Sequence, residues 1–139
     1  MIDRVVATEA AMIALGQECG ATLPGPSILA LCGDLGAGKT QFVKGLARGL
    51  GYDGEVASPT FPLLHEYHSG RHPLFHFDFY RLESEDDLRA LDFEEMLGSG
   101  VVAVEWADRF PDWLPPETRW LHFTILDRDE RRVKEGAHE

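Results

Sequence analysis

The sequence predicts an α/β fold, and three parts of the chain support this prediction. Residues 28–32 are apolar and are bounded by a proline and a glycine, which is typical of a buried strand. A glycine-rich loop and an amphipathic helix follow this strand directly. Residues 101–106 are predicted to form a second buried strand. Residues 61–68 and 74–80 are predicted to pair as a hairpin, because a short turn with Gly and Pro joins them.

The chain of 139 residues is predicted to be one domain, 1–139, with a charged tail from about residue 127. No apolar run approaches the ~20 residues that a membrane span requires, and the first residues do not form a secretory signal. Cys19 and Cys32 have no metal-binding spacing. We therefore expect reduced thiols and a cytoplasmic protein with no membrane partner.

The loop after the first buried strand matches the phosphate-binding pattern Gly-x-x-x-x-Gly-Lys-Thr. Its glycines let the backbone turn tightly and direct N–H groups at a phosphate. Lys39 can reach the β- and γ-phosphates, and the Thr40 hydroxyl can bind Mg²⁺. The following helix also directs its positive dipole end at the anion. The predicted nucleotide-binding residues are Gly33, Asp34, Leu35, Gly36, Ala37, Gly38, Lys39, Thr40 and Gln41.

Helix-capping residues and alternating apolar residues predict the remaining helices and strands. Thr8 is predicted to cap a helix that precedes the first buried strand. Ser84 and Asp92 each open a short acidic helix with a capping-box pattern. Residues 119–126 alternate enough for a final strand, and one more edge pairing is expected around Val133.

Two carboxylates are expected near the phosphate loop. Glu105 ends the second buried strand, where α/β nucleotide-binding proteins place the acid that holds Mg²⁺ or its water. Asp78 alternates with phenylalanines in the strand 74–80, and the phenylalanines belong to the core. Asp78 either faces the nucleotide or forms an ordinary ion pair with Arg81 or a lysine. Trp106 either stacks near the site or simply packs, and the sequence does not decide between these.

Four signatures stand in order along the chain: Gly-Asp-Leu-Gly-Ala-Gly-Lys-Thr at 33–40, Ser-Pro-Thr-Phe at 58–61, His-Phe-Asp-Phe-Tyr-Arg-Leu at 76–82 and Val-Glu-Trp at 104–106. Together they closely resemble the TsaE (formerly YjeE) family, over roughly residues 1–126. The resemblance implies a three-layer, P-loop NTPase-like sandwich with a central mixed sheet and helices on both faces. It also implies a bacterial ATPase that works with TsaB and TsaD to form threonylcarbamoyladenosine at position 37 of tRNAs that read codons beginning with A.

The resemblance also implies ATP and Mg²⁺ as cofactors and a role for each matching residue. Thr40 and Glu105 would be the Mg²⁺ ligands, and Asp78 would support hydrolysis, directly or through water. The family commonly has a second Thr where this chain has Gln41, and this departure leaves the hydroxyl of Thr40 in place.

Two further residues would connect the site to its partners. Thr60 lies in the long polar connection 51–60 and would act as a switch near the γ-phosphate. A solvated connector is the alternative for this segment. Trp106 would border the site and help communicate with the partners.

The net charge of −11 argues against direct binding to RNA, because phosphate neutralisation supplies most of that affinity. The expected partner is the TsaB–TsaD complex, with tRNA reached only through it. A small-molecule kinase is the alternative, although such enzymes usually carry arginines in a lid, and Arg128, Arg131 and Arg132 lie in the tail. The guanine-recognising Asn-Lys-x-Asp motif is impossible, because the chain contains no Asn. A scaffold that binds nucleotide without hydrolysis stays open.

Overall fold

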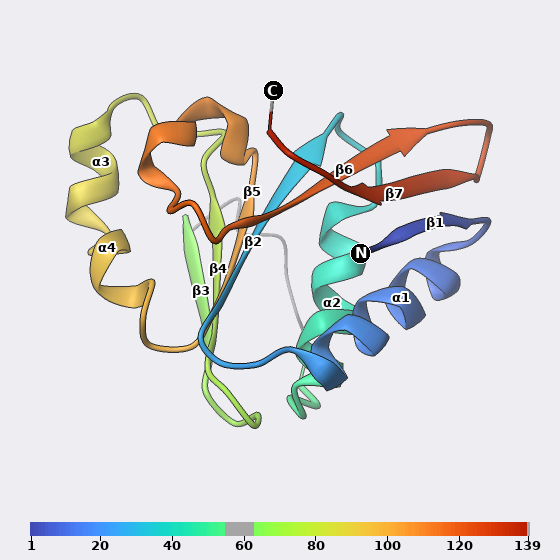
Figure 1. Ribbon diagram of the computed structural model, residues 1–139, viewed down its shortest axis with the longest axis horizontal. Coiled ribbons are helices and arrows are strands. Elements are labelled where there is room, and N and C mark those ends of the chain that lie inside the picture. Colours follow the sequence, from blue (N-terminus) through green and yellow to red (C-terminus); the bar gives the residue numbers. More distant parts are fainter. Residues whose placement is uncertain (55–62, 139) are drawn as a thin grey trace.

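The computed structural model describes residues 1–54 and 63–138. Within these ranges seven strands form one mixed sheet, and helices cover both of its faces (Figure 1). The strands are β1 (Asp3–Val6), β2 (Ser27–Gly33), β3 (Leu64–Tyr67), β4 (Leu74–Asp78), β5 (Val101–Glu105), β6 (Arg119–Ile125) and β7 (Arg131–Glu135). The helices are α1 (Glu9–Thr22), α2 (Lys39–Gly49), α3 (Glu85–Ala90) and α4 (Phe93–Met96), with 3₁₀ turns η1 (Ala107–Arg109) and η2 (Pro111–Trp113).

The strand order is β1-β7-β6-β2-β5-β4-β3, and the four strands from β6 to β4 run parallel. The carboxyl ends of parallel strands lie at one edge of a sheet, which is where α/β proteins bind ligands. The register pairs Glu105 with Leu31 on one side and with Asp78 on the other. The predicted hairpin is confirmed, since β3 and β4 pair antiparallel. The fold therefore brings the ends of β2, β5 and β4 together.

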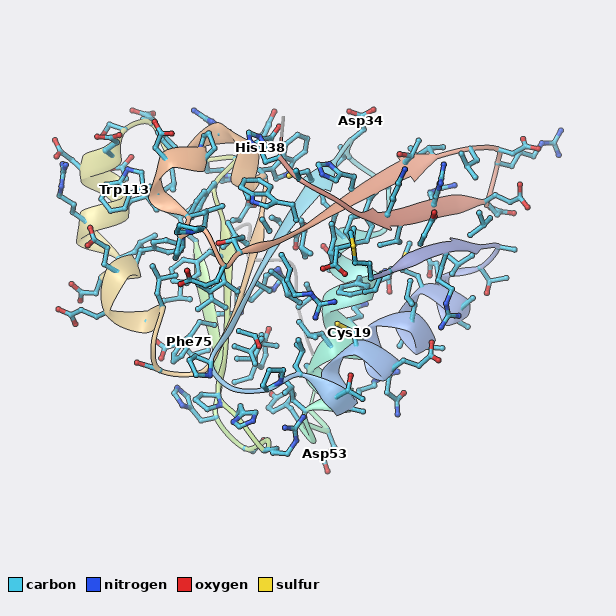
Figure 2. The ribbon with its side chains drawn as sticks, viewed as in Figure 1. Cys19, Asp34, Asp53, Phe75, Trp113 and His138 are labelled. Atoms are coloured by element: carbon cyan, nitrogen blue, oxygen red, sulfur yellow. The ribbon has the colours of Figure 1, made fainter. Side chains whose placement is uncertain are left out.

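Each face of the sheet has its own hydrophobic core. Helices α1 and α2 cover one face, and α3, α4 and the 3₁₀ turns cover the other (Figure 1). Phe77 and Phe79 of the β4 segment pack edge-to-face on Phe93 of α4, with centroids 4.9 and 5.3 Å apart, as the alternation predicted. Trp113 lies beside α3, with the Arg89 guanidinium 5.4 Å from its ring (Figure 2). None of the helices in the described ranges has the length and hydropathy needed to cross a bilayer.

Helices α1 and α2 pack backbone against backbone. A Cβ at Gly45 of α2 would lie 1.8 Å from the carbonyl oxygen of Ile13, and a Cβ at Gly16 of α1 would lie 2.1 Å from that of Phe42. Since real Cβ contacts essentially never fall below 3.0 Å, only glycine allows this approach. The packing fixes the position of α2, which begins with Lys39 and so carries the end of the phosphate loop.

The turn between β3 and β4 donates hydrogen bonds to the carboxyl ends of α1 and α2. The Arg71 guanidinium donates to the carbonyl oxygens of Leu23 (3.1 Å) and Gly20 (2.8 Å) at the end of α1. The backbone N–H of Arg71 donates to the carbonyl of Leu50, directly after α2. Helix ends leave carbonyls without intrahelical donors, and Arg71 supplies donors to both ends.

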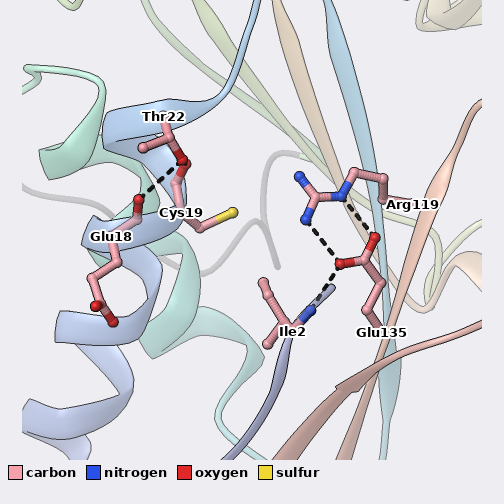
Figure 3. A network of polar contacts seen from close by, with 6 residues as sticks. All are labelled: Ile2, Glu18, Cys19, Thr22, Arg119 and Glu135. Atoms are coloured by element: carbon pink, nitrogen blue, oxygen red, sulfur yellow. Dashed lines mark hydrogen bonds and ion pairs between the residues drawn. The ribbon is translucent and has the colours of Figure 1, made fainter.

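The C-terminal segment differs from the prediction of a charged tail. Residues 131–135 form β7, which lies inside the sheet between β6 and β1. Val133 is completely buried, so the edge pairing expected around it is a full strand. Arg119 binds the Glu135 carboxylate through two contacts of 2.9 and 2.8 Å, and the same carboxylate accepts the Ile2 N–H (Figure 3). The tail prediction is wrong for these residues because one apolar side chain and an ion pair to each neighbouring strand hold a mostly charged strand in place.

The helix caps agree with the sequence only in part. The Thr8 hydroxyl accepts the N–H of Ala11 at 3.0 Å and begins α1, as predicted. The capping box at Ser84 is wrong: within the described residues its side chain makes no capping hydrogen bond. The Asp87 carboxylate instead accepts the N–H of Glu83 at 2.9 Å, one residue further upstream than a capping box requires.

Candidate functional site

The phosphate loop leaves β2 at Gly33 and enters α2 at Lys39. Gly36 and Gly38 have φ values of 83° and 103°, in the left-handed region that glycine adopts without steric cost. The backbone can therefore turn into α2 within a few residues. The first N–H groups of a helix have no intrahelical acceptor, so the start of α2 offers donors to an anion.

The predicted nucleotide-binding residues separate into two groups. Leu35, Gly36, Gly38, Lys39, Thr40 and Gln41 line a cavity of about 730 Å³ at the carboxyl edge of the sheet. Three others shape the loop instead. The Ala37 N–H donates to the Asp34 carbonyl at 3.1 Å, and the Gly33 carbonyl accepts a hydrogen bond from Lys39. The Asp34 side chain points away from the molecule (Figure 2).

Lys39 is only 4% exposed, at one wall of the cavity. Its Nζ donates to the Gly33 carbonyl and lies 3.7 Å from the centroid of the Trp106 ring. Burial lowers the pKa of Lys39, and the nearby Glu105 carboxylate opposes this effect. The ammonium group is thus held by a carbonyl and an aromatic face, both of which an anion can replace.

Thr40 and Glu105 meet, as the sequence predicted. The Thr40 hydroxyl lies 3.2 and 3.4 Å from the two carboxylate oxygens of Glu105, although 65 residues separate them in the chain. The Oε2 atom of Glu105 also lies 2.6 Å from Nε2 of His76, whose side chain is fully buried in β4. One hydroxyl and one carboxylate therefore converge beside the phosphate loop, with an imidazole behind the carboxylate.

Asp78 lies next to Glu105, because the two residues are partners in the β4–β5 register. Its side chain lines the cavity, and its Oδ1 accepts the Tyr80 N–H at 2.8 Å. Burial raises the pKa of Asp78, and the neighbouring Glu105 charge raises it further. The Tyr80 N–H acts in the opposite direction. The site thus holds two adjacent carboxylates in different environments.

Trp106 follows Glu105 with a φ of 58°, a left-handed conformation that is unusual for a bulky residue. Its N–H donates to the Leu31 carbonyl at 3.1 Å, which ties the turn to β2. Its ring lines the cavity between Lys39 and Tyr80, whose ring centroid is 4.9 Å away. Tyr80 is 57% exposed, so this aromatic pair forms a surface at the mouth of the site.

The sequence did not identify every residue at the cavity. Arg131 of β7 donates through Nε to the Gly36 carbonyl at 3.1 Å and lines the cavity, although the prediction placed it in the tail. By alternation His76 shares a face of its strand with Asp78, but no role was predicted for it. Thr60 lies outside the described residues, and its switch role stays a prediction.

A phosphate loop at the carboxyl edge of a mixed sheet, with helices on both faces, defines the P-loop NTPase-like class of α/β proteins. A family model described as "Threonylcarbamoyl adenosine biosynthesis protein TsaE" matches residues 6–134. The chain belongs to the TsaE family.

Relatives agree with this assignment. "tRNA threonylcarbamoyladenosine biosynthesis protein TsaE" of Bacillus subtilis (strain 168) is 46% identical over 106 residues, 76% of this chain and 66% of the relative. The protein of that name from Treponema pallidum is 43% identical over 119 residues, 85% of this chain and 87% of the relative. The crystal structure of Bacillus subtilis YdiB matches with a TM-score of 0.81 and 34% identity, covering 96% of this chain and 83% of that one. With the Bacillus, Synechocystis and Nostoc relatives, the aligned part spans just under two thirds of their length, 62–66%.

Proposed function

We propose that this protein is a Mg²⁺-dependent ATPase that takes part in forming threonylcarbamoyladenosine in tRNA, together with the TsaB–TsaD complex. The observation that carries the ATPase proposal is the convergence of Lys39, Thr40, Asp78 and Glu105 on one cavity beside the phosphate loop. Membership of the TsaE family and the names of the relatives support the pathway.

The residues at the cavity fit a magnesium nucleotide. A volume of about 730 Å³ falls within the range of small-molecule sites, ~300–1,000 Å³. Mg²⁺ prefers oxygen ligands and in nucleotide sites usually takes one or two from the protein and others from phosphates. The Thr40 hydroxyl and the Glu105 carboxylate, which lie 3.2 Å apart, would supply such ligands. When bound, Mg²⁺ would neutralise charge on the phosphate oxygens.

Each residue of the chain would have a distinct part. Lys39 would exchange the Gly33 carbonyl and the Trp106 ring for phosphate oxygens, which are stronger acceptors for an ammonium group. Asp78, with its raised pKa, is suited to take a proton from an attacking water molecule. Glu105 and Thr40 would hold the metal.

Hydrolysis of ATP over a Mg²⁺ titration, followed by phosphate release, tests the enzymatic part. We expect Thr40→Ala and Glu105→Ala to lower the rate on the order of 100-fold while the fold survives, because each removes a ligand rather than core volume. If the Glu105→Ala variant hydrolyses ATP at the normal rate, Asp78 rather than Glu105 is the carboxylate that holds the metal. Phosphorylation of a small molecule in place of hydrolysis would favour the kinase alternative.

ATPase activity with and without purified TsaB–TsaD tests the pathway. We expect the partners to stimulate hydrolysis, and ATP to strengthen their binding relative to ADP, with Thr60→Ala removing most of that difference. Because the net charge is −11, free tRNA should bind weakly. Equal partner affinity in both nucleotide states would refute the switch. Tight, salt-sensitive binding to free tRNA would refute the route through partners.

A further inference from the structure

We propose that His76 is a positioning residue, which holds the Glu105 carboxylate in the orientation that receives Mg²⁺; this inference rests on the proposed function. His76 is fully buried in β4, and its Nε2 lies 2.6 Å from Oε2 of Glu105. An ionised carboxylate only accepts hydrogen bonds, so the imidazole nitrogen is the donor. Contacts of this length with an ionised acceptor are among the stronger hydrogen bonds in proteins.

The sheet register gives His76 this position. His76 pairs with Ala103 across the β4–β5 ladder, and Glu105 pairs with Asp78. His76 and Glu105 are therefore diagonal neighbours on the same face of two adjacent strands. Because both lie in regular strands and the ring is fully buried, the donor has little freedom to move.

The His76 contact distinguishes Glu105 from the adjacent carboxylate, Asp78. The Asp78 carboxylate has its own donor, the Tyr80 N–H at 2.8 Å. Among the described residues, the other donor to Glu105 is the Thr40 hydroxyl, at the longer distances of 3.2 and 3.4 Å. That hydroxyl is itself a proposed metal ligand, so its orientation would be shared between the metal and Glu105. His76 is the donor to Glu105 that would take no part in binding the metal.

The second ring nitrogen of His76, Nδ1, also supports a role for the imidazole in the contact with Glu105. Nδ1 is buried and has no hydrogen-bond partner among the described residues. A buried polar atom without a partner lowers stability, and an apolar side chain of similar size would avoid that cost. Packing alone therefore does not explain an imidazole at this position.

Direct metal binding to the protein–ADP complex tests the proposal, with Mn²⁺ as the probe and free Mn²⁺ followed by electron paramagnetic resonance. We expect His76→Leu to weaken Mn²⁺ binding by roughly 10- to 100-fold, the usual effect of losing a residue that orients a ligand. His76→Gln, whose amide N–H can replace the Nε2 donor, should recover most of the affinity. ADP affinity measured in EDTA should change less than about twofold in both variants, since the phosphate loop is untouched.

A double-mutant comparison separates positioning from folding. In a Glu105→Gln background, His76→Leu should cause no further loss of Mn²⁺ binding, because the positioned group is already altered. If His76→Leu does not fold by circular dichroism, His76→Asn, whose amide is too short to reach Glu105, replaces it with the same expectation. Wild-type Mn²⁺ affinity in the folded variant, or an equal loss in His76→Gln, would overturn the positioning role alone. Absence of nucleotide-dependent Mn²⁺ binding in the wild-type protein would overturn the proposed function and this inference with it.

Discussion

Substitution of Gly45 by alanine tests how α2 is held against α1. A Cβ at this position lies 1.8 Å from the Ile13 carbonyl oxygen and 2.8 Å from the Gln17 nitrogen. Both are backbone atoms of a helix and cannot rotate away. Ordinary contact begins at about 3.4 Å, so the two helices would have to separate by about 1.6 Å at this point.

Overpacking of a core costs ~1–3 kcal/mol, and a clash between backbones belongs at the upper end of that range. Alanine stabilises a helix by ~1 kcal/mol relative to glycine, which offsets part of this cost. We therefore expect Gly45→Ala to lower the free energy of unfolding by about 2 kcal/mol and the melting temperature by roughly 6 °C for a chain of this size. Nucleotide affinity should also fall, because α2 carries Lys39 and Thr40.

Thermal and urea unfolding by circular dichroism measure this effect, and Gly98→Ala provides the matched control. A Cβ at Gly98 meets no atom within 4 Å, so its substitution should change the free energy of unfolding by less than ~0.5 kcal/mol. A Gly45→Ala protein as stable as the control would refute the close approach of the two helices.

Three further predictions concern stability and reactivity. Arg71→Ala should lower the free energy of unfolding in urea by about 1–3 kcal/mol, because two carbonyls at the end of α1 lose their donors; an unchanged midpoint would contradict this. The Arg119 guanidinium lowers the pKa of Glu135 below its ordinary value of 4.5. The contribution of this ion pair to the stability of the protein is therefore complete above pH 4.5, and it is lost as the pH falls through the lowered pKa of the folded state. Arg119→Met should therefore flatten the acid side of the stability–pH profile, and identical profiles would argue against the pair. Burial raises the pKa of Cys32 to about 12 and also raises that of Cys19, so both thiols should react with Ellman's reagent at pH 8 only after unfolding; rapid labelling of the native protein would show otherwise.

The sequence predicted best what depends on neighbouring residues. The strand, the phosphate loop and the start of α2 follow one another within the chain, so periodicity and glycine spacing were enough. Glu105 was predicted at the carboxyl edge of the sheet because it ends a buried strand. For Asp78 the sequence left open a position facing the nucleotide or an ordinary ion pair, and the parallel pairing of β4 with β5 places it beside Glu105. Thr8 was predicted because a cap involves only the next three residues.

Contacts that depend on register or on distant partners were missed. The role of His76 requires the alignment of β4 with β5, which alternation within one strand does not determine. Arg131 reaches Gly36 across 95 positions of sequence, so no local pattern could place it at the cavity. The strand around Val133 was underestimated because four of its five residues are charged, and its stability comes from pairing with both neighbours.

Calorimetric titration of Mg·ATP into the wild-type protein and into Lys39→Ala tests the nucleotide site most directly. The wild-type protein should bind one nucleotide. Lys39→Ala should lose tight binding, by about 10- to 150-fold or more, because hydrogen bonds to charged groups contribute ~1.5–3 kcal/mol each. Equal affinity in the two proteins, or no binding by the folded wild-type protein, would contradict a phosphate-binding role for the loop from Gly33 to Thr40.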